Sequence, residues 1–154
     1  MGKEIERKFL VNGNSYRDMA CHSQHIRQGY LNTNPDSTVR IRIKDSHGYI
    51  TVKGRTTGIT RNEWEYEIPL ADAEEMLERL CGSQVIDKVR YVVNHGNLQW
   101  EIDEFHGTLE GLVLAEVELP DETYAIDKFP DFIGREVSDD PRYFNSALIM
   151  GDIS

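Results

Sequence analysis

Apolar residues alternate with charged or polar ones along several segments of the chain, the period-two pattern of strands with two chemically different faces. This pattern predicts eight strands, over residues 3–11, 24–31, 38–44, 49–54, 59–70, 85–94, 98–105 and 112–119. Residues 45–48 and 95–97 are rich in turn formers, and we expect each to close a hairpin.

Three segments favour helices instead. In residues 72–80, Asp72 can cap the helix with Glu75 three residues on, and a buried stripe is expected from Ala73, Met76, Leu77 and Leu80. Gly82 is expected to end this helix. A short helix is predicted over residues 122–128, and a last one from near Asp140, with Pro141 in its first turn.

The charges on the polar faces are sorted by sign from strand to strand, whereas ordinary solvent faces mix signs. The acidic sets are Glu4/Glu6, Glu63/Glu65, Glu101/Asp103 and Glu116/Glu118, and the basic sets are Arg40/Arg42 and Lys88/Arg90. The opposite faces of the same strands are apolar and must be covered, and helices packed outside would leave the charges pointing inward. We therefore predict an α+β chain: one domain, residues 1–154, built on an eight-stranded closed antiparallel β-barrel with helices outside and a C-terminal helix.

Composition narrows the class of protein. The 154 residues are 39% hydrophobic and carry a formal net charge of -10, which argues against a general nucleic-acid binder. No apolar stretch is long enough to span a membrane, and MGKEIERKFL does not resemble a secretory signal, so we expect a cytoplasmic protein with no membrane or nucleic-acid partner. Cys21 and Cys81 have no metal-ligand spacing and are expected to be buried free thiols.

A lumen lined with both charge signs suits a polyphosphate bound with metal. Arg and Lys on neighbouring strands can neutralise a chain of anionic oxygens. Carboxylates cannot touch that anion directly, but they can hold Mg²⁺ or Mn²⁺, which bridges carboxylate and phosphate. Two ions would suit a displacement at a terminal phosphorus. The pattern therefore favours metal-dependent hydrolysis of a polyphosphate.

Eight motifs resemble those of the CYTH superfamily, also called the triphosphate tunnel metalloenzymes, in that family's order. They are EIERKFL (4–10), QGYL (28–31), VRIR (39–42), TVKG (51–54), EWEYEIP (63–69), KVRY (88–91), EIDEF (101–105) and LAEVEL (114–119). Each is weak alone, but together they span almost the whole chain. The resemblance implies a triphosphate tunnel, catalytic Mg²⁺ or Mn²⁺, and, among small bacterial members, an inorganic triphosphatase.

Carried over position by position, the resemblance implies a role for each matching residue. Phosphate would be bound by Lys8, Arg40, Arg42, Lys53, Lys88 and Arg90. Metal would be held, directly or through water, by Glu4, Glu6, Glu63, Glu65, Asp103, Glu116 and Glu118. The catalytic group would be Glu4, Glu6, Lys8, Glu116 and Glu118. Tyr30 could position water or serve only in packing, and the plug of one tunnel mouth would be Arg142, Tyr143, Asn145 and Ser146.

Other functions stay open from the sequence. The same resemblance covers thiamine-triphosphatases, nucleoside triphosphatases and class IV adenylyl cyclases, although no nucleotide fingerprint or Gly-rich phosphate loop is present. A non-catalytic polyphosphate-binding module would gain little from so many carboxylates. An ordinary barrel or sandwich with a solvated polar face would have to place the sorted charges outside. The sequence also leaves open whether the protein forms a homodimer.

Overall fold

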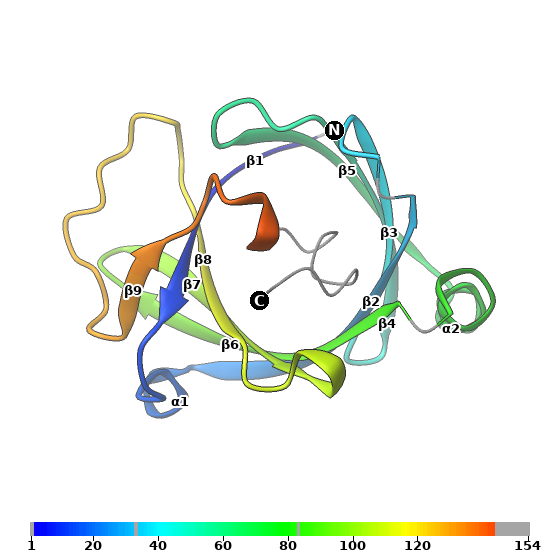
Figure 1. The fold of residues 1–154 in the computed structure, drawn as a ribbon, viewed down its shortest axis with the longest axis horizontal. Coiled ribbons are helices and arrows are strands. Elements are labelled where there is room, and N and C mark those ends of the chain that lie inside the picture. The colour runs from blue at the N-terminus through cyan, green and yellow to red at the C-terminus, as the bar shows by residue number, and fades with distance from the viewer. Residues whose placement is uncertain (1, 33, 83, 144–154) are drawn as a thin grey trace.

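Nine antiparallel strands form one sheet in the computed structural model, which describes residues 2–32, 34–82 and 84–143. The strands are β1 (Gly2–Val11), β2 (His22–Asn32), β3 (Ser37–Lys44), β4 (His47–Gly54), β5 (Thr60–Ile68), β6 (Val85–His95), β7 (Leu98–His106), β8 (Val113–Glu118) and β9 (Ile133–Glu136). They lie in the order β5-β4-β3-β2-β6-β7-β8-β1-β9, and β5 also pairs with β1 (Figure 1). The predicted eight-stranded closed barrel is confirmed, with β9 as one extra strand.

β1 closes the barrel by changing partners along its length. Its first residues, Gly2 to Ile5, pair with β5, and residues 6–10 pair with β8 on the other edge. Beyond the start of β5 the free edge of β1 is taken by β9, with Phe9 opposite Glu136. Arg7 points outward and fixes this junction, because its guanidinium donates to both Glu136 carboxylate oxygens at 2.9 and 2.6 Å. The chain after β9 is thereby brought to the barrel end near Lys8.

Most of the apolar core is a layer between the barrel wall and the segments that cover it from outside. Its largest cluster comprises Phe9, Tyr16, Val93, Leu98, Trp100, Ile102, Ala115, Val117, Leu119 and Phe132. Helix α1 (Tyr16–Met19) and the chain between β8 and β9 supply the cover on this side (Figure 1). Most apolar side chains of the strands thus face outward, as the alternation predicted, and the charged ones face the lumen. Ile86, Phe105 and Leu114 are exceptions: they share the inward parity of Lys88, Asp103 and Glu116 and form a separate buried cluster with Val137.

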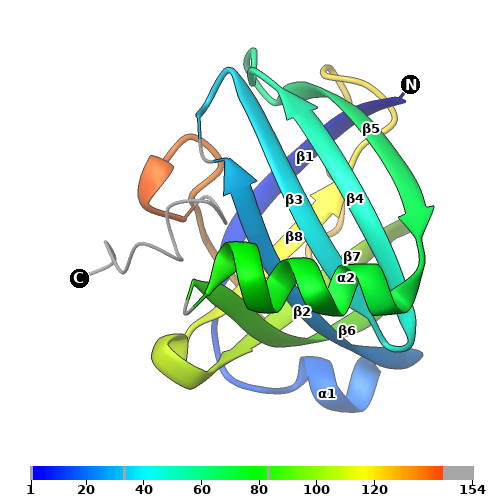
Figure 2. The ribbon, with the colours of Figure 1, turned by 90° about the vertical axis from the view of Figure 1, so that its right-hand side faces the viewer.

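A second covering element packs on the opposite side. Helix α2 (Leu70–Met76) continues into a π-helical turn (Leu77–Cys81) and lies across the outer faces of β2, β3 and β4 (Figure 2). It buries Ala73 and Leu77 against Ile41 and Ile43. Gly29 on β2 permits this contact, since a Cβ built there would lie 2.7 Å from Cys81 Sγ.

Several local predictions differ from the structure. Residues 122–128 form no helix, because Pro120 and Pro130 flank an irregular segment that lays Tyr124 and Ile126 against the core. The helix expected from 72 begins at Leu70 behind Pro69, so Asp72 lies in its first turn and does not cap it. Cys81 is buried as expected, whereas Cys21 is exposed.

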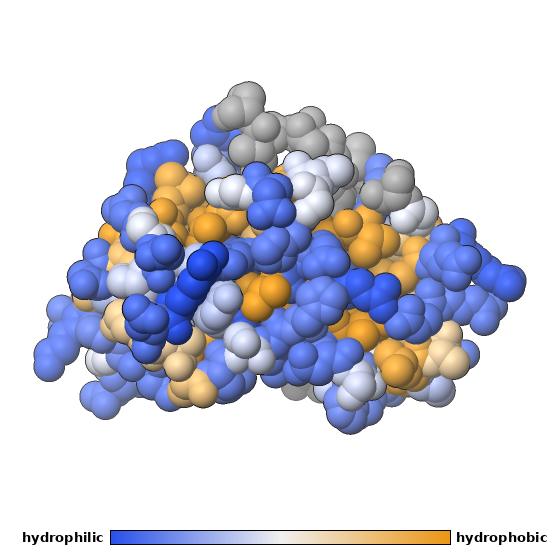
Figure 3. Space-filling model, turned by 90° about the horizontal axis from the view of Figure 1, so that it is seen from below, coloured by the Kyte–Doolittle hydropathy of each residue, from blue (hydrophilic) through white to orange (hydrophobic). Residues whose placement is uncertain are grey.

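Near the C-terminal end of the described chain, Pro141–Tyr143 form a 3-10 turn over the barrel opening (Figure 1). The remainder of the predicted C-terminal helix, and Asn145 and Ser146 of the predicted plug, lie outside the described residues. No helix in the described ranges is both long and apolar enough to cross a membrane. The face seen from below is largely hydrophilic, with hydrophobic patches separated from one another (Figure 3).

Candidate functional site

The sign-sorted charges line the lumen of the barrel. Seven of the predicted site residues are almost inaccessible to solvent: Lys8 (7%), Arg40 (4%), Arg42 (8%), Lys88 (0%), Arg90 (6%), Asp103 (1%) and Glu116 (8%). Burying so many charges is tolerable only where they pair with one another or with a ligand. Their contacts with one another therefore describe the site.

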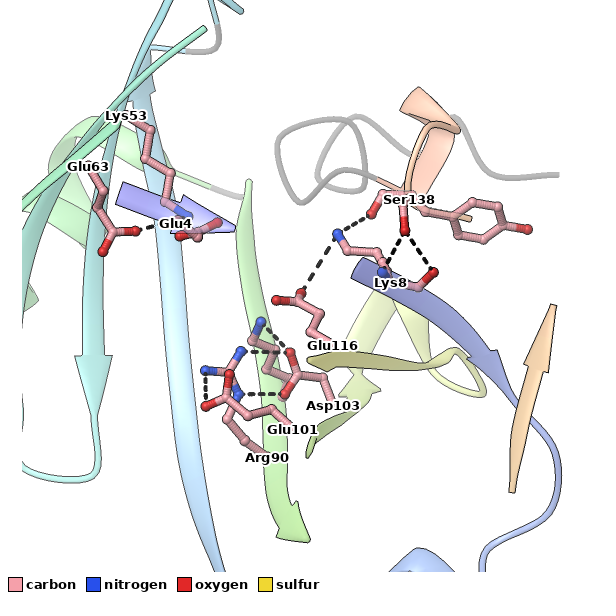
Figure 4. Close-up of polar contacts among 11 residues, drawn as sticks. Glu4, Lys8, Lys53, Glu63, Arg90, Glu101, Asp103, Glu116 and Ser138 are labelled. Atoms are coloured by element: carbon pink, nitrogen blue, oxygen red, sulfur yellow. Dashed lines mark hydrogen bonds and ion pairs between the residues drawn. The ribbon is translucent and has the colours of Figure 1, made fainter. Parts of the chain in front are cut away.

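The central cluster joins Lys88 and Arg90 of β6 to Asp103 of β7, and Arg90 also donates to Glu101 of β7 at 3.2 Å. Lys88 Nζ donates to Asp103 Oδ2 at 2.8 Å, and Arg90 donates to both Asp103 oxygens at 2.8 and 3.0 Å (Figure 4). Burial lowers the pKa of Lys88 to about 7. Burial alone would raise the pKa of Asp103, but Arg90 and Lys88 hold it well below its ordinary value. Because both its oxygens already accept from cations, Asp103 is less suited to the predicted metal role than the other carboxylates.

A second cluster sits where β1 meets β5. Lys53 Nζ on β4 donates to Glu4 Oε2 at 2.8 Å and lies 3.4 Å from Glu63 Oε2 (Figure 4). The two carboxylates also share a hydrogen bond, and this bond is the main reason that the pKa of Glu63 rises to about 7. Lys53 lowers the pKa of Glu4 against the effect of burial. One proton and one ammonium therefore stabilise two adjacent carboxyl groups.

Lys8 forms a third cluster with β8 and the chain after β9. Its Nζ lies 3.7 Å from Glu116 Oε1 and donates to the Tyr143 carbonyl at 2.9 Å. The backbone N–H of Lys8 donates to Ser138 Oγ at 2.8 Å (Figure 4). Ser138 in turn donates to Glu136. Burial alone would raise the pKa of Glu116, but Lys8 and neighbouring cations bring it down to about 2. Lys8 is therefore held from both the backbone and the side chain.

The guanidinium groups of β3 differ in their partners. Arg40 Nη2 donates to Thr51 Oγ1 at 3.2 Å and lies 3.5 Å from Glu65 Oε2. Arg42 Nε donates instead to the amide oxygen of Gln28 at 2.8 Å. Burial, with Arg40 and Arg90 nearby, lowers the pKa of Arg42 to about 9. The two arginines are thus two residues apart but differ in whether a carboxylate offsets their charge.

Glu4, Glu6, Glu63, Glu116 and Glu118 are the carboxylates of the site that could supply ligands to a metal. Glu6 lies directly opposite Glu118 across the β1–β8 ladder, and Glu4 and Glu116 are also near. Burial, together with Glu116 and Glu4, raises the pKa of Glu6 well above its ordinary value, and burial also raises the pKa of Glu118. With Glu63, these groups repel one another in their ionised forms. A hard divalent cation would relieve that repulsion, so their chemistry fits Mg²⁺ or Mn²⁺.

These carboxylates do not converge on one point in the part of the chain that the structure describes. Within residues 2–32, 34–82 and 84–143, no three acidic, histidine or cysteine side chains converge closely enough to hold an ion. Glu65 is turned toward Thr51 and Arg40, and it is classed as exposed, as is Glu118. The structure brings all the predicted phosphate-binding residues into the lumen, while ion binding would require carboxylate side chains to reorient.

A cavity opens at the barrel end near Ser138. Its lining is Glu4, Glu6, Lys8, Tyr30, Thr38, Lys53, Thr56, Gly58, Ile59, Arg61 and Ser138. Arg61 was not among the predicted residues. It donates to the Gly54 carbonyl at 2.6 Å and to Thr38 Oγ1 at 2.8 Å, which leaves it within the cavity wall.

The sequence held a pattern that could have identified Arg61, because it lies two residues before Glu63 and so shares its face of β5. Ser138 had no such pattern, since it lies in an irregular segment. Gln28 was noted only within the QGYL motif, although it is fully buried beside Arg42.

Fold and site together define a closed antiparallel barrel whose polar lumen can bind a polyanion beside a group of carboxylates. The chain belongs to the CYTH domain family, whose model matches residues 2–144.

Two relatives align with nearly the whole chain. A protein named inorganic triphosphatase from Acetivibrio thermocellus is 54% identical over 149 residues, covering 97% of this chain and 94% of the relative. A protein of the same name from Nitrosomonas europaea is 38% identical over 152 residues, covering 96% and 97%.

Solved structures agree on the fold. The crystal structure of an inorganic triphosphatase matches with a TM-score of 0.70 at 34% identity, covering 96% of this chain and 97% of that one. A Pyrococcus horikoshii protein, PH1012, matches with a TM-score of 0.60 at 21% identity, covering 77% and 79%, and shows the fold alone.

Proposed function

We propose that this protein hydrolyses inorganic triphosphate to pyrophosphate and phosphate inside the barrel. The observation that carries the proposal is that the buried cations Lys8, Arg40, Arg42, Lys88 and Arg90 share one lumen with carboxylates. Two relatives that align over at least 96% of the chain are named inorganic triphosphatases, which supports the same substrate here.

The cavity lining favours a bare polyphosphate over an organic triphosphate. Apart from Gly58 and Ile59, its lining residues are charged or carry hydroxyl groups, and Tyr30 is the single aromatic ring among them. A base or thiazole ring would gain little from such a wall, because stacking and apolar contact usually supply much of the affinity for flat organic groups. Phosphate oxygens, by contrast, match guanidinium and ammonium donors.

We assign metal binding to Glu4, Glu6, Glu63, Glu116 and Glu118, directly or through water, with Mg²⁺ or Mn²⁺ as the ions. Two such ions, when bound, would neutralise phosphate oxygens and lower the pKa of a coordinated water. Glu65 and Asp103 fit better as partners of the tunnel cations, given their contacts with Arg40, Lys88 and Arg90.

The protein's own residues would bind the triphosphate and stabilise the leaving group. Arg42, Lys88 and Arg90 would bind the middle of the triphosphate chain, with Arg40 and Lys53 flanking them. Lys8 is held by Ser138 and Tyr143 close to Glu116, which keeps its ammonium beside the carboxylate group. In that position Lys8 would stabilise charge that develops on the leaving pyrophosphate oxygen.

The test is phosphate release from tripolyphosphate, ATP, thiamine triphosphate and pyrophosphate, each with Mg²⁺, Mn²⁺ or EDTA, with cyclic AMP measured in the ATP reactions. We expect the fastest turnover with tripolyphosphate and one of the two metals, and none in EDTA. Preference for ATP or thiamine triphosphate would reject the inorganic substrate. Tight tripolyphosphate binding without turnover under any metal would instead indicate a polyphosphate-binding module.

A further inference from the structure

Gln28 on β2 is a neutral side chain buried among the cations of the lumen. It is 0% exposed, and its Cα lies opposite that of Arg42 in the β2–β3 ladder. Its amide oxygen accepts a hydrogen bond from Arg42 Nε at 2.8 Å. Because a guanidinium only donates, this bond fixes which end of the amide faces Arg42.

The partner of Arg42 sets it apart from the other predicted phosphate-binding residues. Each of the other five lies 3.7 Å or less from a carboxylate oxygen: Lys8 from Glu116, Arg40 from Glu65, Lys53 from Glu4, and Lys88 and Arg90 from Asp103. Among the residues that the structure describes, Arg42 forms no ion pair. Its charge is therefore the least offset of the six.

An amide is the side chain that can orient Arg42 without offsetting its charge. A glutamate at this position would accept the same hydrogen bond, but it would also neutralise the guanidinium. An aliphatic side chain would leave Nε without its acceptor. The amide nitrogen of Gln28 has no partner within the described part of the chain, so it adds a second buried donor beside the guanidinium. Both features favour an anion at this place in the lumen.

We propose that Gln28 is a positioning residue that holds the Arg42 guanidinium in place while leaving its positive charge for the triphosphate. This inference rests on the proposed function, since it takes triphosphate as the anion. It makes Arg42 the principal phosphate anchor and explains a neutral residue at the centre of a charged tunnel.

The test compares Gln28→Glu with Gln28→Met in the full-length protein, by calorimetric titration with sodium tripolyphosphate in EDTA. Gln28→Glu keeps the acceptor but adds a negative charge, and we expect the Kd to rise at least about tenfold, the order expected for one like charge beside a buried polyanion site. Its thermal midpoint should not fall, because a new Arg42 ion pair forms. Gln28→Met removes the acceptor without adding charge, and should raise the Kd by about threefold, the loss of one modest hydrogen bond.

Two controls separate this role from simple packing. Asn62→Asp makes the same amide-to-carboxylate change at an exposed position of β5 and should leave the Kd unchanged. In an Arg42→Ala background, Gln28→Met should have no further effect, because Gln28 acts through Arg42. A Gln28→Met penalty of the same size in both backgrounds would overturn the proposal, as would a Gln28→Glu Kd equal to that of the wild type.

The binding assay also separates this proposal from the proposed function. Wild-type protein that binds tripolyphosphate but releases no phosphate with Mg²⁺ or Mn²⁺ would overturn hydrolysis alone. Active wild-type protein whose tripolyphosphate affinity is unaffected by Gln28→Glu would overturn the role of Gln28 alone.

Discussion

Lys53 on β4 contacts Glu4 on β1 at 2.8 Å even though β5 lies between the two strands. The contact passes over β5 on the lumen side, so the ammonium belongs to the tunnel and not to one pair of strands. Lys53 is also the cation that keeps Glu4 ionised beside Glu63.

We therefore expect Lys53→Met to raise the KM for tripolyphosphate by about tenfold, since a charge-assisted contact to phosphate is lost. Lys3→Met is the matched control, because Lys3 is exposed on the same sheet and should give wild-type kinetics. Steady-state kinetics at fixed metal concentration would check both variants. An unchanged KM in Lys53→Met would remove Lys53 from the substrate site.

Glu6→Gln should uncouple stability from activity. Because the pKa of Glu6 is raised by burial and by neighbouring carboxylates, its ionised form is unfavourable in the metal-free fold. The amide should leave the thermal midpoint in EDTA unchanged or higher, while turnover falls by at least about 100-fold, as expected for loss of a metal ligand. Glu118→Gln should likewise leave the thermal midpoint in EDTA unchanged or higher and lower the turnover.

Thermal melts in EDTA and phosphate release with Mg²⁺ or Mn²⁺ would check this pair of effects. Glu110→Gln, an exposed position beyond β7, serves as the charge control. Turnover by Glu6→Gln at the wild-type rate would refute its assignment to the metal site.

The contact between Tyr16 and Glu104 should affect stability without affecting catalysis. Tyr16 is 1% exposed and donates to Glu104 Oε2 at 2.5 Å on the outer side of the barrel, where Arg17 also donates at 2.6 Å. Tyr16→Phe leaves the buried carboxylate with one partner fewer and should cost about 1–3 kcal/mol of unfolding free energy at pH 7. Urea denaturation would measure this cost, and kcat and KM should stay at wild-type values.

The same contact predicts the direction of a pH effect. Burial alone would raise the pKa of Glu104, but the hydrogen bonds from Arg17 and Tyr16 lower it below its ordinary value. A carboxyl group with a lowered folded-state pKa stabilises the fold above its unfolded pKa, and that stabilisation is lost as the pH falls through the folded value. The difference in stability between wild type and Tyr16→Phe should therefore shrink between pH 5 and the acid transition. A difference that grows on acidification would contradict this assignment.

Gly29→Ala should loosen the contact between α2 and the barrel. An added Cβ would lie 2.7 Å from both Cβ and Sγ of Cys81, closer than packed atoms tolerate. We expect a loss of about 1–3 kcal/mol, the usual cost of overpacking. Gly54→Ala is the control, because its nearest neighbour would be 3.8 Å away, and differential scanning calorimetry would compare the two. Equal thermal midpoints would show that Cys81 can move aside without cost.

The fold was largely predictable because its strands have two different faces. Ile41 faces outward and Arg42 inward on β3, and this alternation alone fixes which face needs cover. The CYTH family and the barrel are confirmed, whereas the metal ions, the cytoplasmic location and pairing with a second copy stay predictions.

What the sequence could not predict depends on partners far along the chain. β9 has only four residues. It can pair with β1 because the β1–β5 pairing stops at Ile5 and leaves the rest of that edge of β1 available. The role of Gln28 depends on its contact with Arg42 on the neighbouring strand, and the role of Ser138 depends on its contact with the backbone of Lys8. No local pattern carries such information.

The pairing of β1 also bears on how the protein is made. Every strand that β1 contacts, β5, β8 and β9, lies later in the chain, so the edges of β1 stay unpaired until those strands have been synthesised. Topologies dominated by such distant contacts fold slowly, in milliseconds to seconds, and expose strand edges meanwhile. The alternating charges of β1 would then reduce aggregation of the nascent chain through its unpaired strand edges, before the barrel can bind a substrate.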